Sequence, residues 1–195
     1  MAQSSMTIEI TNTKTIMKDI VKKQANGAKA VNAVCKEFKT RAPAWISQAI
    51  TQDYTIKKKD INSNKKGAKV AGKIKVAGVS VDNIQIEYQG RLLTPTHFKM
   101  TPRVRPQRKY VVRAEIKKGA KKVLGSRVFL GGTGGEIQIP FQREEGAGRL
   151  PIKAVKTVSV PQMISAEETS MKIQELIDEN MKKRLDHHID RFNKM

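Results

Sequence analysis

The C-terminal part of the chain carries an unbroken apolar stripe, and this stripe constrains the fold more than any other feature. Its members follow one another at intervals of three or four residues: Ile173, Ile177, Met181, Leu185, Ile189 and Phe192. Residues at this spacing share one face of an α-helix, and the other positions carry charges of both signs. The stripe therefore predicts a helix over 165–193 that buries one face in protein. Ser165 and Glu168 have the spacing of a capping box, which predicts the start of the helix.

Residues 13–63 also repeat with a helical period. Gly27 interrupts this pattern and predicts a break or kink, because glycine weakens a helix interior. Pro43 suits the first turn of a second helix. A short third helix is expected in "TIKKKDI", with Ile56 and Ile61 turned inward. The polar residues 1–12 are expected to form an N-terminal arm or a short strand.

Residues 67–160 alternate apolar and polar side chains and predict mainly β structure. In "KYVVRAEIKKG", alternate residues from Tyr110 to Ile116 point to one side of a strand and those from Val111 to Lys117 point to the other. Pro140 indicates that its strand lies at a sheet edge or ends there. The order of elements predicts an α+β fold for a single domain over 13–195, with N-terminal helices, a central antiparallel β-sheet and a long C-terminal helix.

The charge of the chain is high and unevenly distributed. The net charge is +20, and residues 54–127 alone carry 20 Lys and Arg against 4 Asp and Glu, which gives +16. Such a concentration favours a surface that faces a polyanion or an acidic partner over a basic face that serves only solubility. We predict that the contacting side chains are those of the most basic stretch: Arg103, Arg105, Arg108, Lys109, Arg113 and Lys117.

These side chains can pair with phosphates or with carboxylates. No recognition helix or series of aromatic platforms accompanies them, so any DNA contact is expected to involve the backbone without sequence preference. The basic stretch by itself is therefore compatible with a nucleic-acid backbone and with acidic protein surfaces.

The stretch "GRLPIKAVKTVSVPQMI" predicts an extended arm bounded by Pro151 and Pro161. A segment of this kind loses little conformational entropy when it is ordered, and it can add a strand to the sheet of a neighbouring subunit. The predicted subunit-contact residues are its apolar members: Leu150, Ile152, Val155, Val158 and Val160.

No catalytic, cofactor-binding or metal-binding residues are predicted. The single cysteine, Cys35, lies in a helical pattern and is expected to be a buried thiol, and the histidines do not have metal-ligand spacing. The glycine-rich "GGTGGE" lacks the Lys-Ser/Thr of a phosphate-binding loop and is expected to be a hairpin loop. An enzyme is therefore the least favoured class, and no apolar run is long enough to predict a membrane span or a signal peptide.

Two stretches, "HFKMTPR…KYVVRAEIKKGAKK" and "GRLPIKAVKTVSVPQMI", followed by a helix of mixed charge, resemble the prophage minor tail protein Z family. The resemblance implies a structural virion protein of a long-tailed phage or a phage-derived tail particle, without enzyme activity or cofactor. It implies a role in tail completion and head–tail joining, as a ring at the head-proximal end of the tail tube, assembled in the bacterial host cytoplasm.

The partners implied by the resemblance are further copies in a cyclic ring, for which six subunits are expected, the tail tube, and neck or connector proteins. Non-specific contact with DNA in the lumen is also compatible with it, and no membrane contact is implied. The alternative function is that of a nucleic-acid-binding protein that contacts the backbone without sequence preference. A defined ring in the absence of DNA favours the tail protein, and a monomer that assembles only on DNA favours the alternative.

Overall fold

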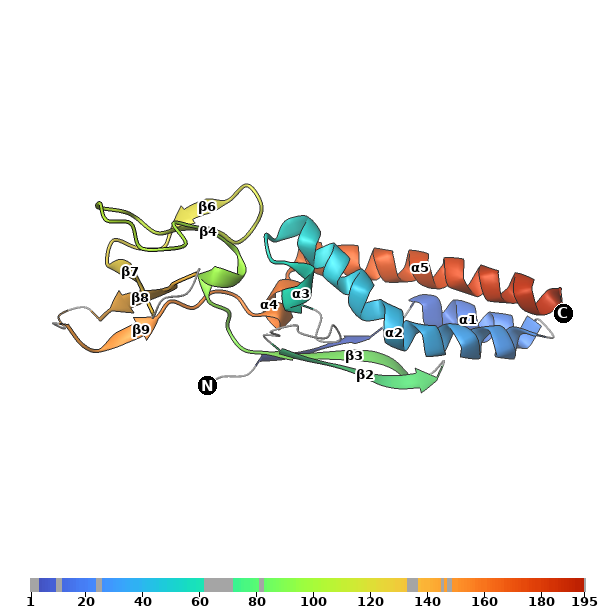
Figure 1. Ribbon diagram of the computed structural model, residues 1–195. Coiled ribbons are helices and arrows are strands. Elements are labelled where there is room, and N and C mark those ends of the chain that lie inside the picture. The colour runs from blue at the N-terminus through green and yellow to red at the C-terminus, as the bar shows by residue number, and fades with distance from the viewer. Residues whose placement is uncertain are drawn as a thin grey trace.

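The computed structural model describes residues 4–9, 12–23, 26–61, 72–80, 83–132, 137–144, 146 and 149–194. It has the predicted α+β fold, with helices towards the N-terminus, antiparallel sheets and a long C-terminal helix (Figure 1). The molecule is elongated and has two parts. The part that contains the long helices is called the helical half, and the part formed by residues 99–154 is called the β half.

The helical half is built on three long helices and a three-stranded sheet. The helices are α1 (Asn12–Lys23), α2 (Gly27–Asp53) and α5 (Glu167–Asn193), with the short α3 (Lys58–Ile61) and α4 (Val160–Ser165) near the β half. The strands are β1 (Ser4–Glu9), β2 (Gly72–Ser80) and β3 (Asn83–Gly90), in the order β1-β3-β2. The segment expected as an arm or a short strand thus includes strand β1, which pairs antiparallel with β3.

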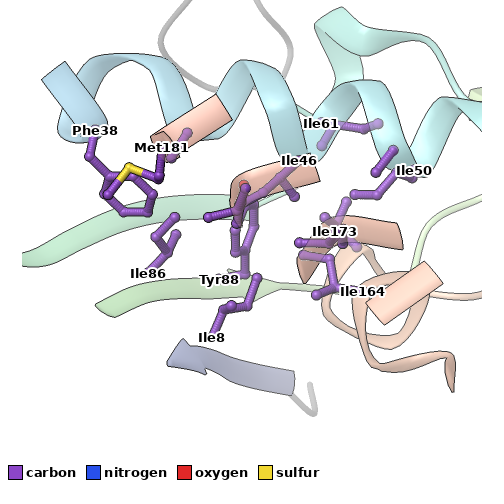
Figure 2. Packing of buried hydrophobic residues seen from close by; sticks show 14 of the residues in the cluster. Ile8, Phe38, Ile46, Ile50, Ile61, Ile86, Tyr88, Ile164, Ile173 and Met181 are labelled. Carbon is purple, nitrogen blue, oxygen red and sulfur yellow. The ribbon is translucent and has the colours of Figure 1, made fainter. Parts of the chain in front are cut away.

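The main core lies between this sheet and the helices. Figure 2 shows Ile8, Ile86 and Tyr88 of the sheet directed towards residues of α2 and α5. The predicted stripe is buried as expected at Ile173, Ile177, Met181 and Leu185, whereas Ile189 and Phe192, near the end of α5, are half-buried. Cys35, Ile56 and Ile61 are also buried, as the sequence predicts. Burial raises the pKa of the Cys35 thiol, which keeps it protonated and unreactive.

The β half has two further antiparallel sheets, so the predicted β region is divided among three sheets. One contains β4 (Lys99–Thr101), β5 (Arg113–Glu115) and β6 (Lys121–Val123), and the other contains β7 (Val128–Gly131), β8 (Ile139–Arg143) and β9 (Ile152–Ala154). A separate small core holds these sheets together: Met100, Val112, Val128 and Leu130. The predicted glycine-rich hairpin loop joins β7 to β8, and its residues 133–136 lie outside the described residues.

The first turns of α2 and the position of Pro43 show how tertiary contacts set the helix boundaries. The predicted break occurs just before Gly27, where an added Cβ would clash with the carbonyl oxygen of Ile20. The expectation that Pro43 begins a helix is wrong, because α2 continues through it. Proline inside a helix costs about 3 kcal/mol, because it removes one hydrogen bond and its ring clashes with the carbonyl of the preceding turn. Pro43 and its neighbour Ala42 are buried, and this burial offsets part of that cost.

The start of the C-terminal helix also differs from the prediction. The capping box is formed by Ser159 and Gln162 at α4, where the Gln162 N–H donates to Ser159 Oγ at 3.3 Å and the Ser159 N–H donates to Gln162 Oε1 at 2.9 Å. The predicted box at Ser165 and Glu168 is wrong, because Ser165 is the last residue of α4 and its hydroxyl donates to the Gln162 carbonyl. Helix α5 begins at Glu167 without a side-chain cap.

Pro140 lies in the central strand of its sheet, and the prediction of an edge or strand end is therefore wrong. It is the second residue of β8, which pairs with β7 on one side and β9 on the other. The ladder with β9 ends at Ala154, and the Pro140 carbonyl accepts the next hydrogen bond from the Val155 N–H at 2.9 Å. The N–H group that proline lacks would face β9 as well, because both polar groups of one residue in an antiparallel strand face the same neighbour. Its absence therefore falls where the ladder with β9 ends, and the pairing with β7 is unaffected.

Ion pairs connect α2 with α5, which run antiparallel. Arg184 donates two hydrogen bonds to the Glu37 carboxylate, at 2.5 and 2.7 Å, and Lys172 contacts Asp53 at 2.5 Å. The Arg184 hydrogen bond is the main cause of a lowered pKa at Glu37. Burial acts to raise the pKa of Asp53, but the hydrogen bonds from Lys172 and Thr169 outweigh it and lower that pKa. Both carboxylates therefore stabilise the fold in their ionised form.

His188 lies beside this network and is almost completely buried. Its Nε2 is 3.5 Å from Glu37 Oε1, and neither ring nitrogen has a hydrogen-bond partner among the described residues. Burial lowers the pKa of His188 below the usual 6.5, an effect to which Arg184 and His187 add and which Glu37 opposes. The folded protein therefore favours the neutral imidazole.

We predict that acidification lowers the free energy of unfolding in two stages. As the pH falls through the usual histidine pKa of 6.5, His188 binds a proton in the unfolded state but stays neutral in the folded state. The free energy of unfolding therefore decreases. A second loss of stability follows below the usual pKa values of 4.5 for Glu37 and 3.8 for Asp53. In this range the two carboxylates take up protons in the unfolded state before they do so in the folded state. Urea unfolding over a pH series measures both stages. The variant His188→Leu should lose the upper stage and keep the lower one; an unchanged upper stage in this variant would contradict the assignment.

Candidate partner-binding groove on the β half

A basic groove opens between the loop of residues 105–111 and the start of strand β7. Its volume is about 1280 Å³, and side chains of Arg143 on β8 and Arg113 on β5 also line it. Within the described part of the chain, its lining includes six cationic residues and no Asp or Glu: Arg105, Arg108, Lys109, Arg113, Arg127 and Arg143. The described residues of the groove therefore form a concave surface that carries positive charge.

Hydrogen bonds fix the walls of this groove relative to each other. The Leu130 N–H on β7 donates to the Tyr110 hydroxyl at 3.0 Å, and the Leu124 N–H donates to the Val112 carbonyl at 3.0 Å. At the other end of the loop, the Arg105 N–H donates to Gln138 Oε1 at 2.9 Å. The buried Val112 anchors the strand that follows the loop in the small core. Because the loop is tied at both ends, the groove exists before any partner binds.

The structure brings together four of the six predicted basic-face residues. Arg105, Arg108, Lys109 and Arg113 line the groove. Arg103 lies at a second hollow, and Lys117 lies at the junction of the two halves, 4.0 Å from Glu168. Neither of these two lines the groove.

Arg127 and Arg143 are groove residues that the sequence did not reveal. Arg143 is separated from the 105–113 stretch by two strands, and its guanidinium lies over the Phe129 ring at 4.9 Å from the centroid. The strand alternation that places residues 129 and 143 on the same face of the sheet is the signal that could have identified Arg143.

The second hollow has mixed charge and a volume of about 810 Å³. His97 Nδ1 lies 3.8 Å from Asp60, and Lys99 Nζ lies 3.4 Å from Glu115. The Gly119 N–H that donates to Glu115 is the main cause of a lowered pKa at this carboxylate, and Lys99 contributes to it. The cations of the second hollow are partly neutralised by carboxylates of the same chain. This hollow is therefore a weaker candidate than the basic groove for binding an acidic partner.

The two halves are joined by backbone contacts that set the position of the groove relative to the helices. The Lys118 N–H donates to the Asp53 carbonyl at 2.8 Å, and the Thr55 N–H donates to the Ile116 carbonyl at 3.0 Å. The two segments that connect the halves are also bonded to each other, because the Thr157 N–H donates to the Leu93 carbonyl at 2.7 Å. The end of α2 is thereby fixed to strand β5, which carries Arg113.

The predicted subunit-contact residues range from exposed to buried. Leu150 is 70% exposed and Ile152 is 38% exposed, whereas Val155 and Val158 are half-buried and Val160 is buried in the main core. Much of the expected arm forms contacts within its own chain, because β9 pairs with β8 and Thr157 bonds to Leu93. Strand β9 is the outer strand of its sheet, and Leu150 lies just before it.

Among the described residues, no group of three His, Cys, Asp or Glu side chains is placed to hold a metal ion. None of the described helices has the length and apolar character needed to cross a bilayer.

A preformed cationic groove favours association with partners of opposite charge. Comparison with protein families gives a specific result: the family described as prophage minor tail protein Z (GPZ) matches residues 6–194, and the chain belongs to this family. No curated protein and no solved structure matches the chain. The resemblance seen in the sequence is thus confirmed over nearly the whole chain, and the protein is a structural component of a phage tail.

Proposed function

We propose that this protein completes the phage tail by forming a ring at the head-proximal end of the tail tube, where it joins the tail to the neck. It acts by assembly and not by catalysis. The observation that carries the proposal is the segregation of charge: a chain of net charge +20 gathers Arg105, Arg108, Lys109, Arg113 and Arg143 around one groove. Copies arranged in a ring would repel one another unless acidic groups face these cations.

Carboxylate-rich surfaces of adjacent proteins are the better counterpart for this groove. DNA has to pass through a tail, and tight binding of its phosphates would slow that passage. Ion pairs between rings instead hold the particle together without contacting the moving DNA. The groove then gives specificity and a fast encounter, which are the usual contributions of complementary charge at interfaces.

The exposed side chains beside β9 support a contact between copies. Leu150 and Ile152 are exposed apolar residues at the outer strand of a sheet, and such a strand can pair with a strand of another chain. The half-buried and buried members of the predicted set hold the segment in its own chain. The proposed subunit contact therefore involves the 149–152 end of the segment.

The purified chain is expected to form a closed ring, for which we propose six subunits, without added DNA. Measuring its mass by light scattering, with and without DNA, tests this expectation. Leu150→Lys should shift the mass to the monomer, since the residue is 70% exposed in the single chain and its replacement leaves the fold intact. Met171→Lys on α5 is the matched control, because Met171 is also exposed, at 55%. A monomer that assembles only on DNA would instead support non-specific nucleic-acid binding.

A further inference from the structure

We propose that the basic groove binds an extended acidic peptide segment that also carries apolar side chains, supplied by a neighbouring protein of the particle. The source of the segment rests on the proposed function, whereas the chemistry of the groove is independent of it. A groove of about 1280 Å³ exceeds the roughly 300–1,000 Å³ of small-molecule sites, so its occupant is a length of polymer.

The apolar part of the groove indicates that this polymer is more than a chain of charges. Val111 is 50% exposed, and Val128, Tyr110 and Phe129 line the groove with it. An exposed valine among arginines gains nothing from a phosphate or an isolated carboxylate. It is stabilised when an aliphatic or aromatic side chain of the partner covers it.

The two aromatic rings argue against a single-stranded nucleic acid as the occupant. Such strands bind by stacking their bases on open aromatic faces. The Arg143 guanidinium already occupies one face of Phe129, and Tyr110 is half-buried and fixed by its bond from the Leu130 N–H. Duplex DNA would use the charges but not Val111. The combination of cations with a small aliphatic surface therefore fits a peptide.

The charges of the groove define where carboxylates of such a peptide bind. Arg105, Arg108 and Lys109 lie on one wall, and Arg113 lies on the strand after it. Arginine pairs with carboxylates through two parallel hydrogen bonds, so the wall favours a segment with several Asp or Glu residues. A second copy presenting the same groove would bring like charges together and is excluded as the occupant.

Fluorescence anisotropy with a labelled peptide of alternating Glu and Leu tests this proposal on the full chain. Two further peptides separate the contribution of charge from that of apolar contact. One has Gln in place of Glu, and the other has Ser in place of Leu. Both are expected to bind at least about tenfold more weakly than the parent peptide. Labelled single-stranded and duplex DNA of similar length complete the series.

Paired variants locate the binding. Arg105→Gln with Arg108→Gln should weaken peptide binding by at least about tenfold, whereas Lys121→Gln with Lys122→Gln, which removes the same charge from β6 outside the groove, should change it little. Val111→Ser should weaken the Glu-Leu peptide but not its Ser-containing form. Val123→Ser is its control, because Val123 is 52% exposed and lies outside the groove.

Equal effects of the two charge pairs, or no effect of Val111→Ser, would overturn the proposal. Tighter binding of either DNA than of the Glu-Leu peptide would assign the groove to nucleic acid and would also overturn it. Groove variants that lose peptide binding but still join heads to tails would overturn the assignment of the segment to a neighbouring protein of the particle, and ring formation would remain as the test of the proposed function. If the protein bound the peptide as expected but neither formed a ring nor joined heads to tails, the proposed function would be contradicted. The proposed specificity of the groove would still be supported.

Discussion

Ile177→Asp is expected to destabilise the protein by at least about 4 kcal/mol, a large part of the about 5–15 kcal/mol by which small domains are typically stable. Ile177 is completely buried in the main core, in the middle of the apolar face of α5. An aspartate there would be an unpaired charge in apolar surroundings, which is among the most costly single changes. Urea unfolding followed by circular dichroism measures the loss of stability.

Two companion variants show whether burial of this face is the cause. Ile177→Ala removes only apolar contact and should cost about 2–5 kcal/mol. Met171→Asp introduces the same charge on the same helix at a position that is 55% exposed, and it should change stability by about 0.5 kcal/mol or less. If Ile177→Asp unfolded at the same urea concentration as the wild type, the stripe would have to face solvent.

Neutralising the groove is expected to abolish most head–tail joining without unfolding the protein. The replacement of Arg105, Arg108 and Lys109 by Gln removes three exposed cations from one wall of the groove, so it should leave the fold intact. The yield of joined particles, counted by electron microscopy after adding the variant to lysates that lack this protein, should fall by at least about tenfold. Adding Arg103→Gln should have little further effect, because Arg103 lies outside the groove.

Salt and a matched variant separate a local effect from a general change of charge. Raised salt should reproduce the defect with the wild-type protein, because exposed ion pairs are screened within about 10 Å at moderate ionic strength. Replacing Lys118, Lys121 and Lys122 by Gln removes the same charge outside the groove and should preserve joining. If the groove variant joined heads to tails normally but failed to hold or deliver DNA, the groove would contact DNA and not an acidic protein surface.

Local patterns in the sequence determined the elements whose period is long and regular. The spacing from Ile173 to Phe192 defines a helix because residues three and four apart meet on one helical face whatever surrounds them. The alternation from Tyr110 to Ile116 likewise predicted a strand with a buried face. Val112 and Ala114 are buried as expected, but only Arg113–Glu115 form the strand. The excess of Lys and Arg over 54–127 predicted a cationic surface, since charge is a property of composition.

Helix and strand boundaries depended on contacts that no local pattern contains. Two stretches have the spacing of a capping box, and the chain uses Ser159 instead of Ser165 because a separate short helix, α4, packs into the core before α5 begins. Pro43 is tolerated inside α2 because its surroundings bury it. Local propensity is worth at most a few kcal/mol at each of these positions, so packing can override it.

Tertiary structure decided which of the predicted cations meet in the groove and which others join them. The sequence placed Arg103 with Arg105 and Lys117 with Arg113, yet the fold directs Arg103 and Lys117 to other surfaces. It brings Arg143 to the groove from a strand far along the chain. The sequence therefore determined the sign of the charge and the elements that carry it. The packing of the sheets in the β half determined which charges meet, because distance in space depends on how strands pair and not on their order in the chain.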